Sequence, residues 1–221
     1  MRVEYCNYEL IKYHIAEALV VAGLAKSTDT KHLEEDIRGV EALLQGYIGI
    51  FTKDKNDRLK EHLARGYKLG KAKSGSGHDC FLKGVVVTAV VSAPAYQWPQ
   101  IQRYHFQDII TSQSKMHRIT NFNIRAMCNP EVDDEVIERV EDYVKSYNWT
   151  NIPDQKEYYF RKIINNAPQG LRLAAGITTN YLQLKTQYYQ RNNHRLTEWN
   201  TDFINWLEKL PYFFEYIGVE S

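Results

Sequence analysis

A short stretch of the chain, from Trp98 to Arg118, collects side chains suited to binding an anion. The only acidic residue among them is Asp108. The basic, imidazole and hydroxyl groups are those of Arg103, His105, Ser112, Ser114, Lys115, His117 and Arg118. Lys and Arg supply positive charge and serine hydroxyls are compact donors, so together they can hold a phosphate or another oxyanion. The same residues could form a solvated helix face, and the stretch alone leaves both interpretations open.

The overall charge limits the classes of partner. The 221 residues include 28 Lys and Arg against 27 Asp and Glu, which gives a formal net charge of +1. Nucleic-acid coats and membrane-surface proteins usually carry a strong basic excess, so neither function is expected. The sequence has no stretch near the ~18 apolar residues of a membrane span, and the N-terminal residues lack the apolar segment of a signal peptide. We therefore expect a cytoplasmic protein.

The cysteines show no spacing typical of a metal site or a disulfide framework. There are three of them, far apart and without a CxxC pair: Cys6, Cys80 and Cys128. An odd number of isolated cysteines is typical of incidental thiols in a reducing compartment. The histidines outside the basic stretch also lack partners at ligand spacing, so no bound metal is expected.

Hydrophobic periodicity predicts three helices in the first part of the chain, at residues 8–24, 31–45 and 54–67. Asp29 or Thr30 is the expected N-cap of the second helix. We expect the three helices to pack together as a helical layer within residues 1–68. The following Gly-, Ser- and Lys-rich segment up to Asp79 offers little to bury and is predicted to be a mobile loop.

Two apolar runs predict strands in the rest of the chain. Residues 84–93 are almost unbroken in apolarity and end at Pro94, as expected of a central strand buried on both faces. Leu171–Thr179 predicts a second strand, after which Asn180 should cap a helix. Further helices are expected from Asn129, over residues 153–166 and over residues 196–207. Without repeats or a clear boundary, the pattern favours one α+β domain over residues 1–221, a small buried sheet surrounded by helices.

Several residues outside and inside the basic stretch stand at fixed distances from one another. They are His78, sixteen positions before Pro94 (94 − 78); Gln100, Arg103 and His105, six, nine and eleven positions after it; and Pro168, Asn180 and Arg191, at successive intervals of twelve and eleven. These residue types and spacings resemble the flavin-dependent thymidylate synthases, the ThyX family. In that family a histidine opens a strand ending in Ala-Pro, and a helix then carries Gln and an Arg-His-Arg signature into a Ser-bearing loop. The run from residue 179 to residue 199 also resembles a phage-type branch, and the resemblance covers roughly residues 74–210.

The resemblance implies a role for each of these residues. FAD would be held by His78, Arg103, His105 and Asn180. A dUMP-type nucleotide would be bound by Gln100, Ser112, Ser114, Lys115 and Arg191. Arg191 would also be catalytic, because a guanidinium beside the uracil can stabilise negative charge as the ring is activated, while serine and Lys115 can hold the 5′-phosphate.

Two of these residues also have ordinary structural interpretations. His78, in a Gly/Ser loop, could be a solvent-exposed histidine. Arg191 begins the run R-N-N-H-R, which could be a solvated helix C-terminus interacting with the helix dipole. The neighbouring His194, Arg195 and Glu198 could support Arg191 or form a surface ion pair, and we expect them at the surface.

The resemblance further implies an activity and an assembly. In the family a one-carbon group is added to C5 of dUMP, with the carbon from methylenetetrahydrofolate, the hydride from reduced FAD, and NADPH reducing the flavin. The active sites lie between subunits of a homotetramer, which would suit the 16 Tyr and 4 Trp of this chain. The expectation is a ThyX-like methyltransferase of dTMP biosynthesis, in the cytoplasm of a bacterium or of a phage-infected host.

The chain departs from the family's pattern at several flavin-binding positions. Tyr104 and His105 stand where the family has His and Arg, Leu182 where it has Arg, and Thr186 where it has Asn. These changes deplete the contacts to the flavin phosphates. They leave a second hypothesis, a non-catalytic nucleotide-binding protein that keeps the ThyX fold but has lost flavin binding. Sequence-independent nucleic-acid binding is disfavoured by the near-zero net charge.

Overall fold

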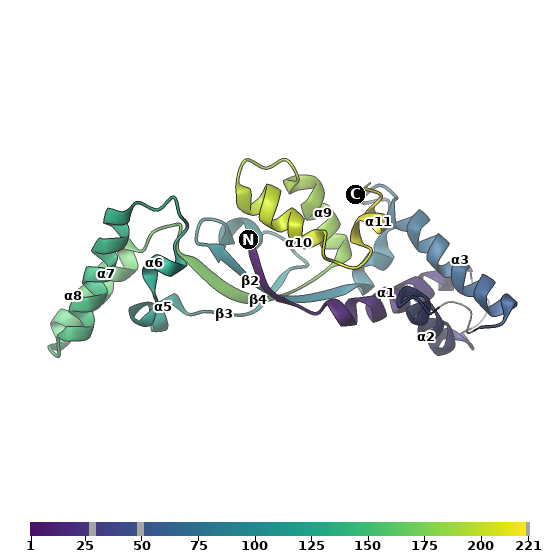
Figure 1. Ribbon diagram of the computed structural model, residues 1–221, viewed down its shortest axis with the longest axis horizontal. Coiled ribbons are helices and arrows are strands. Elements are labelled where there is room, and N and C mark those ends of the chain that lie inside the picture. Colours follow the sequence, from purple (N-terminus) through teal and green to yellow (C-terminus); the bar gives the residue numbers. More distant parts are fainter. Residues whose placement is uncertain (27–29, 48–50, 220–221) are drawn as a thin grey trace. The chain divides into compact units, whose positions relative to one another are not determined.

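The computed structural model describes residues 1–26, 30–47 and 51–219 (Figure 1). Its contacts group into two compact units. Unit 1 consists of Met1–Glu4 and Val90–Ile177, and unit 2 of Tyr5–Ala89 and Thr178–Ser221. In the described part of the chain, no helix is long and apolar enough to cross a membrane.

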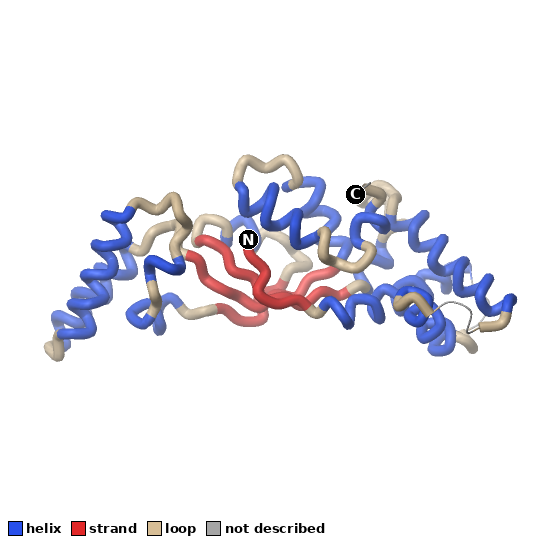
Figure 2. The backbone as a smooth tube through the Cα atoms, in the orientation of Figure 1, coloured by secondary structure: helices blue, strands red, loops and turns tan. Residues whose placement is uncertain are grey.

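Among the described residues, four strands form one sheet in the order β1–β2–β4–β3 (Figure 2): β1 (Arg2–Cys6), β2 (Val86–Pro94), β4 (Arg172–Asn180) and β3 (Asp108–Ser112). β2 and β4 are antiparallel, because Tyr181 N donates to Val85 O while Ala95 N donates to Leu171 O. β2 lies between two strands, which confirms the predicted central strand. Its side chains alternate between buried and half-buried, so only one of its faces is fully covered.

The sequence pattern predicts neither β1 nor β3. Every residue of β3 is exposed, and the strand lies at an edge of the sheet. A strand that buries neither face has no need to alternate apolar and polar residues, so its hydrophobic pattern carries no strand signal. The basic stretch is therefore not one solvated helix face, which was one of its two interpretations, because β3 interrupts it.

In unit 2, the three predicted N-terminal helices are α1 (Tyr8–Ala22), α2 (Leu33–Leu44) and α3 (Lys53–Gly70). They pack against one another, which confirms the helical layer. A short 3-10 helix, η1 (Gly23–Lys26), follows α1. The N-cap of α2 is His32 rather than Thr30, and Asp29 lies outside the described residues.

The C-terminal part of unit 2 consists of α9 (Tyr181–Arg191), a π-helical segment η4 (Glu198–Phe203), α10 (Ile204–Leu207) and α11 (Phe213–Ile217). The predicted helix over residues 196–207 therefore begins with a π-helical turn. α11 packs on α3, where the rings of Tyr67 and Tyr216 stack with centroids 4.9 Å apart. α9 packs on η2 (Cys80–Gly84), the 3-10 helix that precedes β2.

Unit 1 contains α4 (Trp98–Ile101), α5 (Lys115–Arg118), η3 (Ile119–Asn121), α6 (Ile124–Met127), α7 (Asp134–Trp149) and α8 (Pro153–Asn166). α7 and α8 pack against each other over a buried aliphatic cluster: Ile119, Ile124, Ile137, Val140, Ile163 and Leu171. The bounds of α8 match the prediction. α7 begins later than predicted, because Asn129 is held outside the helix by buried hydrogen bonds with Tyr96 and Arg172.

Candidate functional site

The basic stretch folds in unit 1 as two short helices with an edge strand between them. Gln100 lies in α4, Ser112 ends β3, and Lys115 begins α5. The resemblance implies that Gln100, Arg103 and His105 lie on one helix. α4 ends at Ile101, however, so Arg103 and His105 lie in the turns beyond it. The start of α4 is fixed by Trp98, whose indole Nε1 donates to Ala93 O at 3.0 Å.

Gln113 anchors the part of this stretch that contains both candidate serines. Its backbone N donates to Ala174 O at 2.8 Å, and its side-chain Oε1 accepts from Ala174 N at 2.8 Å. Next to it, Ser114 caps α5, because its Oγ accepts from His117 N at 3.2 Å. The cap uses the hydroxyl as an acceptor and leaves its proton free to be donated to an anion. Gln113 was not indicated by the sequence pattern, since a polar residue between two serines looks like ordinary loop.

The cations of the stretch are not neutralised within the described structure. Arg103, His105 and Arg118 are exposed and Lys115 is half-buried. None of these four side chains makes an ion pair or hydrogen bond with a residue in the described ranges. Their positive charge therefore remains available to an external anion, as the anion-binding interpretation requires.

Gln97 is a further polar residue that the sequence pattern did not indicate. It directly precedes α4 and is 0% exposed, and neither amide atom of its side chain has a hydrogen-bond partner among the described residues. An unsatisfied buried amide costs roughly 1–3 kcal/mol. Gln97 is therefore a candidate, next to Gln100, for contact with a polar ligand atom.

In unit 2, His78 is one of the residues that line a mostly apolar cavity of about 600 Å³. The walls come from α1 and from the residues around η2, and they include Ala18, Val21, Leu69 and Phe81. Pockets that bury drug-sized ligands have volumes of roughly 300–1,000 Å³ and mostly apolar walls. His78, which the resemblance assigns to the flavin, is thus exposed, as the ordinary interpretation expects, but it also lines an apolar cavity of this size.

The segment before His78 is anchored by a buried lysine, Lys185 of α9. Its Nζ donates to Gly70 O at 2.8 Å, to Ala72 O at 2.6 Å and to Asp79 Oδ2 at 2.7 Å. The side chains of Lys185 and Asp79 are each 2% exposed, and an ammonium group has three donors, all of which are used here. The prediction of a mobile loop up to Asp79 is therefore wrong at both ends, since α3 continues to Gly70 and Asp79 is buried.

Asn180 caps α9, as predicted. Its side-chain Oδ1 accepts from Gln183 N at 2.9 Å, while its Nδ2 bonds to no residue in the described ranges. The cap satisfies one of the N–H groups that a helix N-terminus leaves free. The free Nδ2 is the group that could contact a cofactor.

Replacing Asn180 separates these two roles. We expect Asn180→Ala to lower the free energy of unfolding, measured in urea, by about 1 kcal/mol, because the cap is lost. Asn180→Asp should retain the stability, since a carboxylate also caps a helix and favours its N-terminus. If Nδ2 contacts a flavin phosphate, the aspartate variant should still bind the flavin less tightly. Equal stability of the alanine variant and the unmodified protein would contradict the capping role.

Arg191 ends α9, and its guanidinium packs on an aromatic ring. Its Cζ lies 4.7 Å from the ring centroid of Trp199, which is 0% exposed. Burial, and then the nearby Arg191 and Arg195, lower the pKa of His194. The end of α9 is thus electropositive, and Arg191 packs on a buried ring there. The ordinary interpretation, a fully solvated helix C-terminus, does not describe this contact. Glu198, expected at the surface, is buried at 9% exposure.

The structure also describes positions where the chain departs from the family's pattern. Thr186 Oγ1 donates to Leu182 O at 3.1 Å, so its hydroxyl proton is bonded within α9. Tyr104 is 9% exposed, and His105 is exposed. The Thr186 hydroxyl therefore offers no free donor to a ligand.

The candidate residues belong to both units. The stretch with Gln100, Arg103, His105, Ser112, Ser114 and Lys115 is in unit 1, and His78, Asn180 and Arg191 are in unit 2. Within residues 1–26, 30–47 and 51–219, no three His, Cys, Asp or Glu side chains are grouped so that they could hold a metal ion.

Comparison with solved structures identifies the fold. The chain is similar to flavin-dependent thymidylate synthase ThyX from Helicobacter pylori, in a crystal structure with FAD and dUMP, at a TM-score of 0.57 and 11% identity, covering 98% of this chain and 96% of that chain. A second structure of Helicobacter pylori ThyX with FAD and dUMP gives a TM-score of 0.56 at 11% identity, with 98% and 95% covered. By sequence, the chain matches no protein-family model and no curated protein. The expected ThyX-like α+β fold is confirmed.

Proposed function

We propose that this chain binds a pyrimidine deoxynucleotide of the dUMP type and transfers a one-carbon group to C5 of its base. The observation that carries the proposal is the anchored segment Ser112–Lys115, with its unneutralised cations, in a ThyX-like fold. Solved structures with this fold contain FAD and dUMP.

In this proposal the substrate is held by charge-assisted hydrogen bonds. Ser112, Ser114 and Lys115 bind the 5′-phosphate, since compact hydroxyl donors and an ammonium suit a dianion. Gln100 contacts the nucleotide, and Arg191 lies beside the base, where its guanidinium stabilises negative charge that develops on the ring. The stack on Trp199 restricts the rotamers of Arg191, so less entropy is lost when it binds.

The cofactor of the proposal is FAD, and the described residues fit it in part. Of the residues that the resemblance assigns to FAD, His78 lines the apolar cavity, Asn180 has a free Nδ2, and Arg103 and His105 are exposed. When bound, reduced flavin would supply the hydride, with methylenetetrahydrofolate as the carbon donor and NADPH as the reductant. The chain's own residues would bind and orient these groups and exclude water from them.

Exposed apolar side chains near the candidate phosphate segment support assembly of several copies. Phe106 is 55% exposed, Ile110 60% and Met116 54%. They belong to or flank β3, an edge strand whose free backbone groups also favour pairing. We propose a cytoplasmic homo-oligomer, a homotetramer as in the family, in which this face is covered by another subunit.

The second candidate function is nucleotide binding without catalysis. The observation that favours it is the loss of flavin-phosphate donors in α9, where Leu182 has no polar group and the Thr186 hydroxyl is bonded within the helix. Such a protein would bind the nucleotide through the same serines, Lys115 and Arg191 but would have no affinity for FAD.

A visible spectrum and an FAD titration distinguish the two candidates. The enzyme should be purified with a flavin absorption band or should bind added FAD saturably. Calorimetry with dUMP, dCMP and dTMP then identifies the base. No flavin band together with no FAD binding would eliminate the enzyme, and no binding of any of the three nucleotides would eliminate both candidates.

Substitution of Arg191 tests the nucleotide site directly. We expect Arg191→Gln to weaken dUMP binding by about 10–100-fold in calorimetry, because a charge-assisted hydrogen bond is worth roughly 1.5–3 kcal/mol. The matched control is Arg195→Gln, which removes the same charge from an exposed residue nearby. Equal losses in the two variants would mean that only the general electrostatic field matters, and Arg191 would have no specific role.

A further inference from the structure

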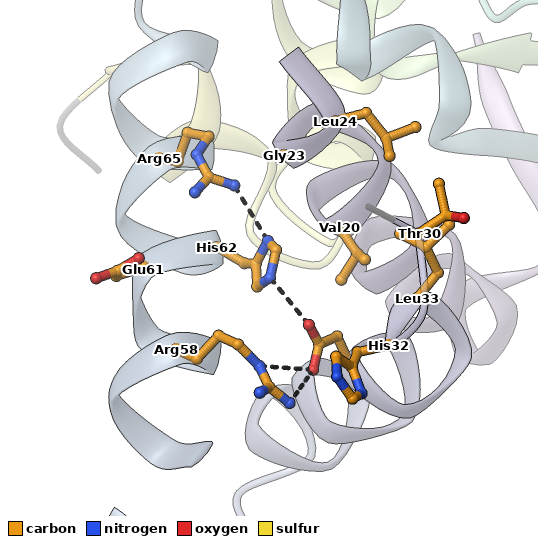
Figure 3. Close-up of a pocket in the computed structure, with 11 residues that line it drawn as sticks. Val20, Gly23, Leu24, Thr30, His32, Leu33, Arg58, Glu61, His62 and Arg65 are labelled. Carbon is orange, nitrogen blue, oxygen red and sulfur yellow. Dashed lines mark hydrogen bonds and ion pairs between the residues drawn. The ribbon is translucent and has the colours of Figure 1, made fainter. Parts of the chain in front are cut away.

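A second cavity, of about 270 Å³, lies in unit 2 among the N-terminal helices (Figure 3). It is lined by residues of α2 and α3 and by the end of α1, and it contains none of the residues assigned above to the nucleotide or the flavin. Figure 3 shows Arg58, His62 and Arg65 reaching from one side of the α3 helix toward the cavity. The charges of these groups decide what the cavity can bind.

The one buried acid of the cavity, Asp36, is already engaged through both oxygens. Its Oδ1 accepts from Arg58 Nε at 3.0 Å and from Arg58 Nη2 at 2.7 Å. Its Oδ2 lies 3.5 Å from His62 Nε2. Asp36 is 6% exposed, and the guanidinium of Arg58 balances its charge. The carboxylate therefore does not make the cavity negative.

His62 adds no positive charge near neutral pH. Burial, and then the neighbouring Arg65, lower the pKa of its imidazole, and together they outweigh Asp36 and a hydrogen bond with the Leu19 backbone, which raise it. A neutral ring with Nε2–H toward Asp36 leaves Nδ1 as an acceptor. Arg65 Nη1 lies 3.2 Å from that Nδ1 and donates to it.

Arg65 therefore carries a charge that no acid among the described residues neutralises. It makes no ion pair within the described residues, and its only hydrogen bond there is to the neutral His62. Glu61 is exposed and points away from the other labelled side chains in Figure 3, and His32 pairs with the exposed Glu35 at 3.5 Å. Gly23, the C-cap of α1, approaches Arg65 closely, so the negative end of the α1 dipole favours the guanidinium without cancelling its charge.

We propose that this cavity is a second ligand site, which binds a phosphate group between Arg65 and Arg58. Arg65 Nε and Nη2 and Arg58 Nη1 bond to no described residue, so both arginines retain donors for an anion. A carboxylate ligand has two oxygens, and one guanidinium can bind both of them. A phosphate has enough oxygens to accept hydrogen bonds from Arg58 and Arg65 at once. A volume of about 270 Å³ lies below the roughly 300–1,000 Å³ of pockets that bury whole drug-sized ligands, which favours a phosphate group over a complete nucleotide.

The test is a titration of the full chain with inorganic phosphate at constant ionic strength, followed by the imidazole resonances of His62 in NMR. Because His62 touches Arg65, an anion in the cavity should shift its resonances saturably, while phosphate at Ser114 and Lys115 should not. Parallel titrations with acetate and with dUMP separate a free phosphate from a carboxylate and from a nucleotide phosphate. Inorganic phosphate should bind at least about tenfold more tightly than acetate.

Two variants make the result specific. Arg65→Gln should weaken phosphate binding about tenfold or more. Arg38→Gln removes an exposed arginine of the adjacent α2 and should leave the affinity unchanged. No saturable shift of His62 in the unmodified protein, or equal affinities in the Arg65 and Arg38 variants, would overturn the proposal, and neither result bears on the nucleotide site.

Discussion

Lys185→Met is expected to lower the free energy of unfolding by about 3–5 kcal/mol, the usual cost of removing one partner of a buried ion pair. The substitution leaves the carboxylate of Asp79, which is 2% exposed, without its counter-ion. It also removes the donor to Gly70 O and Ala72 O. Methionine fills a similar volume, so the loss reports the missing charge and hydrogen bonds more than a cavity. Equilibrium unfolding in urea measures it.

Two controls isolate the buried pair. Lys209→Met removes an exposed lysine of the same unit and should change stability by less than about 0.5 kcal/mol. The double variant Lys185→Met/Asp79→Leu removes both charges and should be less destabilised than Lys185→Met alone, because no unpaired buried charge remains. A single variant as stable as Lys209→Met would show that Lys185 does not hold this segment.

The same pair connects stability to the candidate cofactor site. Gly70, Ala72 and Asp79 enclose the segment that leads to His78, and Lys185 is bonded to all three. Amide hydrogen exchange in residues 71–79 should therefore be faster in Lys185→Met than in the Lys209 variant. If the proposed flavin site is correct, FAD affinity should fall in parallel, because His78 would no longer be held at its cavity.

The sequence predicted the elements that bury a continuous apolar face. α1, α2, α3 and α8 were found from helical periodicity, and β2 from its β-branched run, because burial requires a regular pattern. The pattern gave no indication of β3, which buries nothing and is held by pairing alone. It also placed the start of α7 too early, since the acidic residues after Asn129 suit a first helical turn as well as the loop before it.

The sequence indicates the residue types of the candidate site, but it does not indicate the groups that hold those residues in place. The spacings pointed to Asn180 and Arg191, and the structure describes a cap at Asn180 and an aromatic platform under Arg191. The groups that fix these residues in place, such as Gln113 and Lys185, were missed. Their partners lie 61 and 106 positions away along the chain, and no local pattern reveals contacts at that separation.

Lys185 shows why a polar residue on a buried helix face is informative. In α9 it lies between Leu184 and Thr186, within a run whose residues Tyr181 and Leu184 are also fully buried. An ammonium on the buried side of a helix is unfavourable unless the rest of the fold supplies hydrogen-bond acceptors for it. That conflict was visible in the sequence, and it is the signal that could have found the residue.

Gly70→Ala is the second substitution with a large expected effect, a loss of roughly 1–3 kcal/mol or more in the free energy of unfolding. A Cβ at Gly70 would lie 2.3 Å from the backbone oxygen of Tyr216 in α11. A side chain could rotate away from such a contact, but a backbone carbonyl moves only if α11 moves. That movement would disturb the stack of Tyr216, 0% exposed, on Tyr67. The higher helix propensity of alanine offsets at most about 1 kcal/mol of this loss in the free energy of unfolding.

The matched control is Gly176→Ala in β4, where the nearest atom to a new Cβ, Thr111 Cγ2, is 3.8 Å away. That distance is ordinary van der Waals contact, and the glycine has no left-handed backbone, so the change should be neutral or stabilising by up to about 1 kcal/mol. Thermal and urea unfolding of both variants should therefore give shifts of opposite sign or very different size. Equal stability of the Gly70→Ala and Gly176→Ala variants would mean that α11 can move away from α3 at no cost in free energy. The close contact at Gly70 would then not help to hold the segment that Lys185 binds.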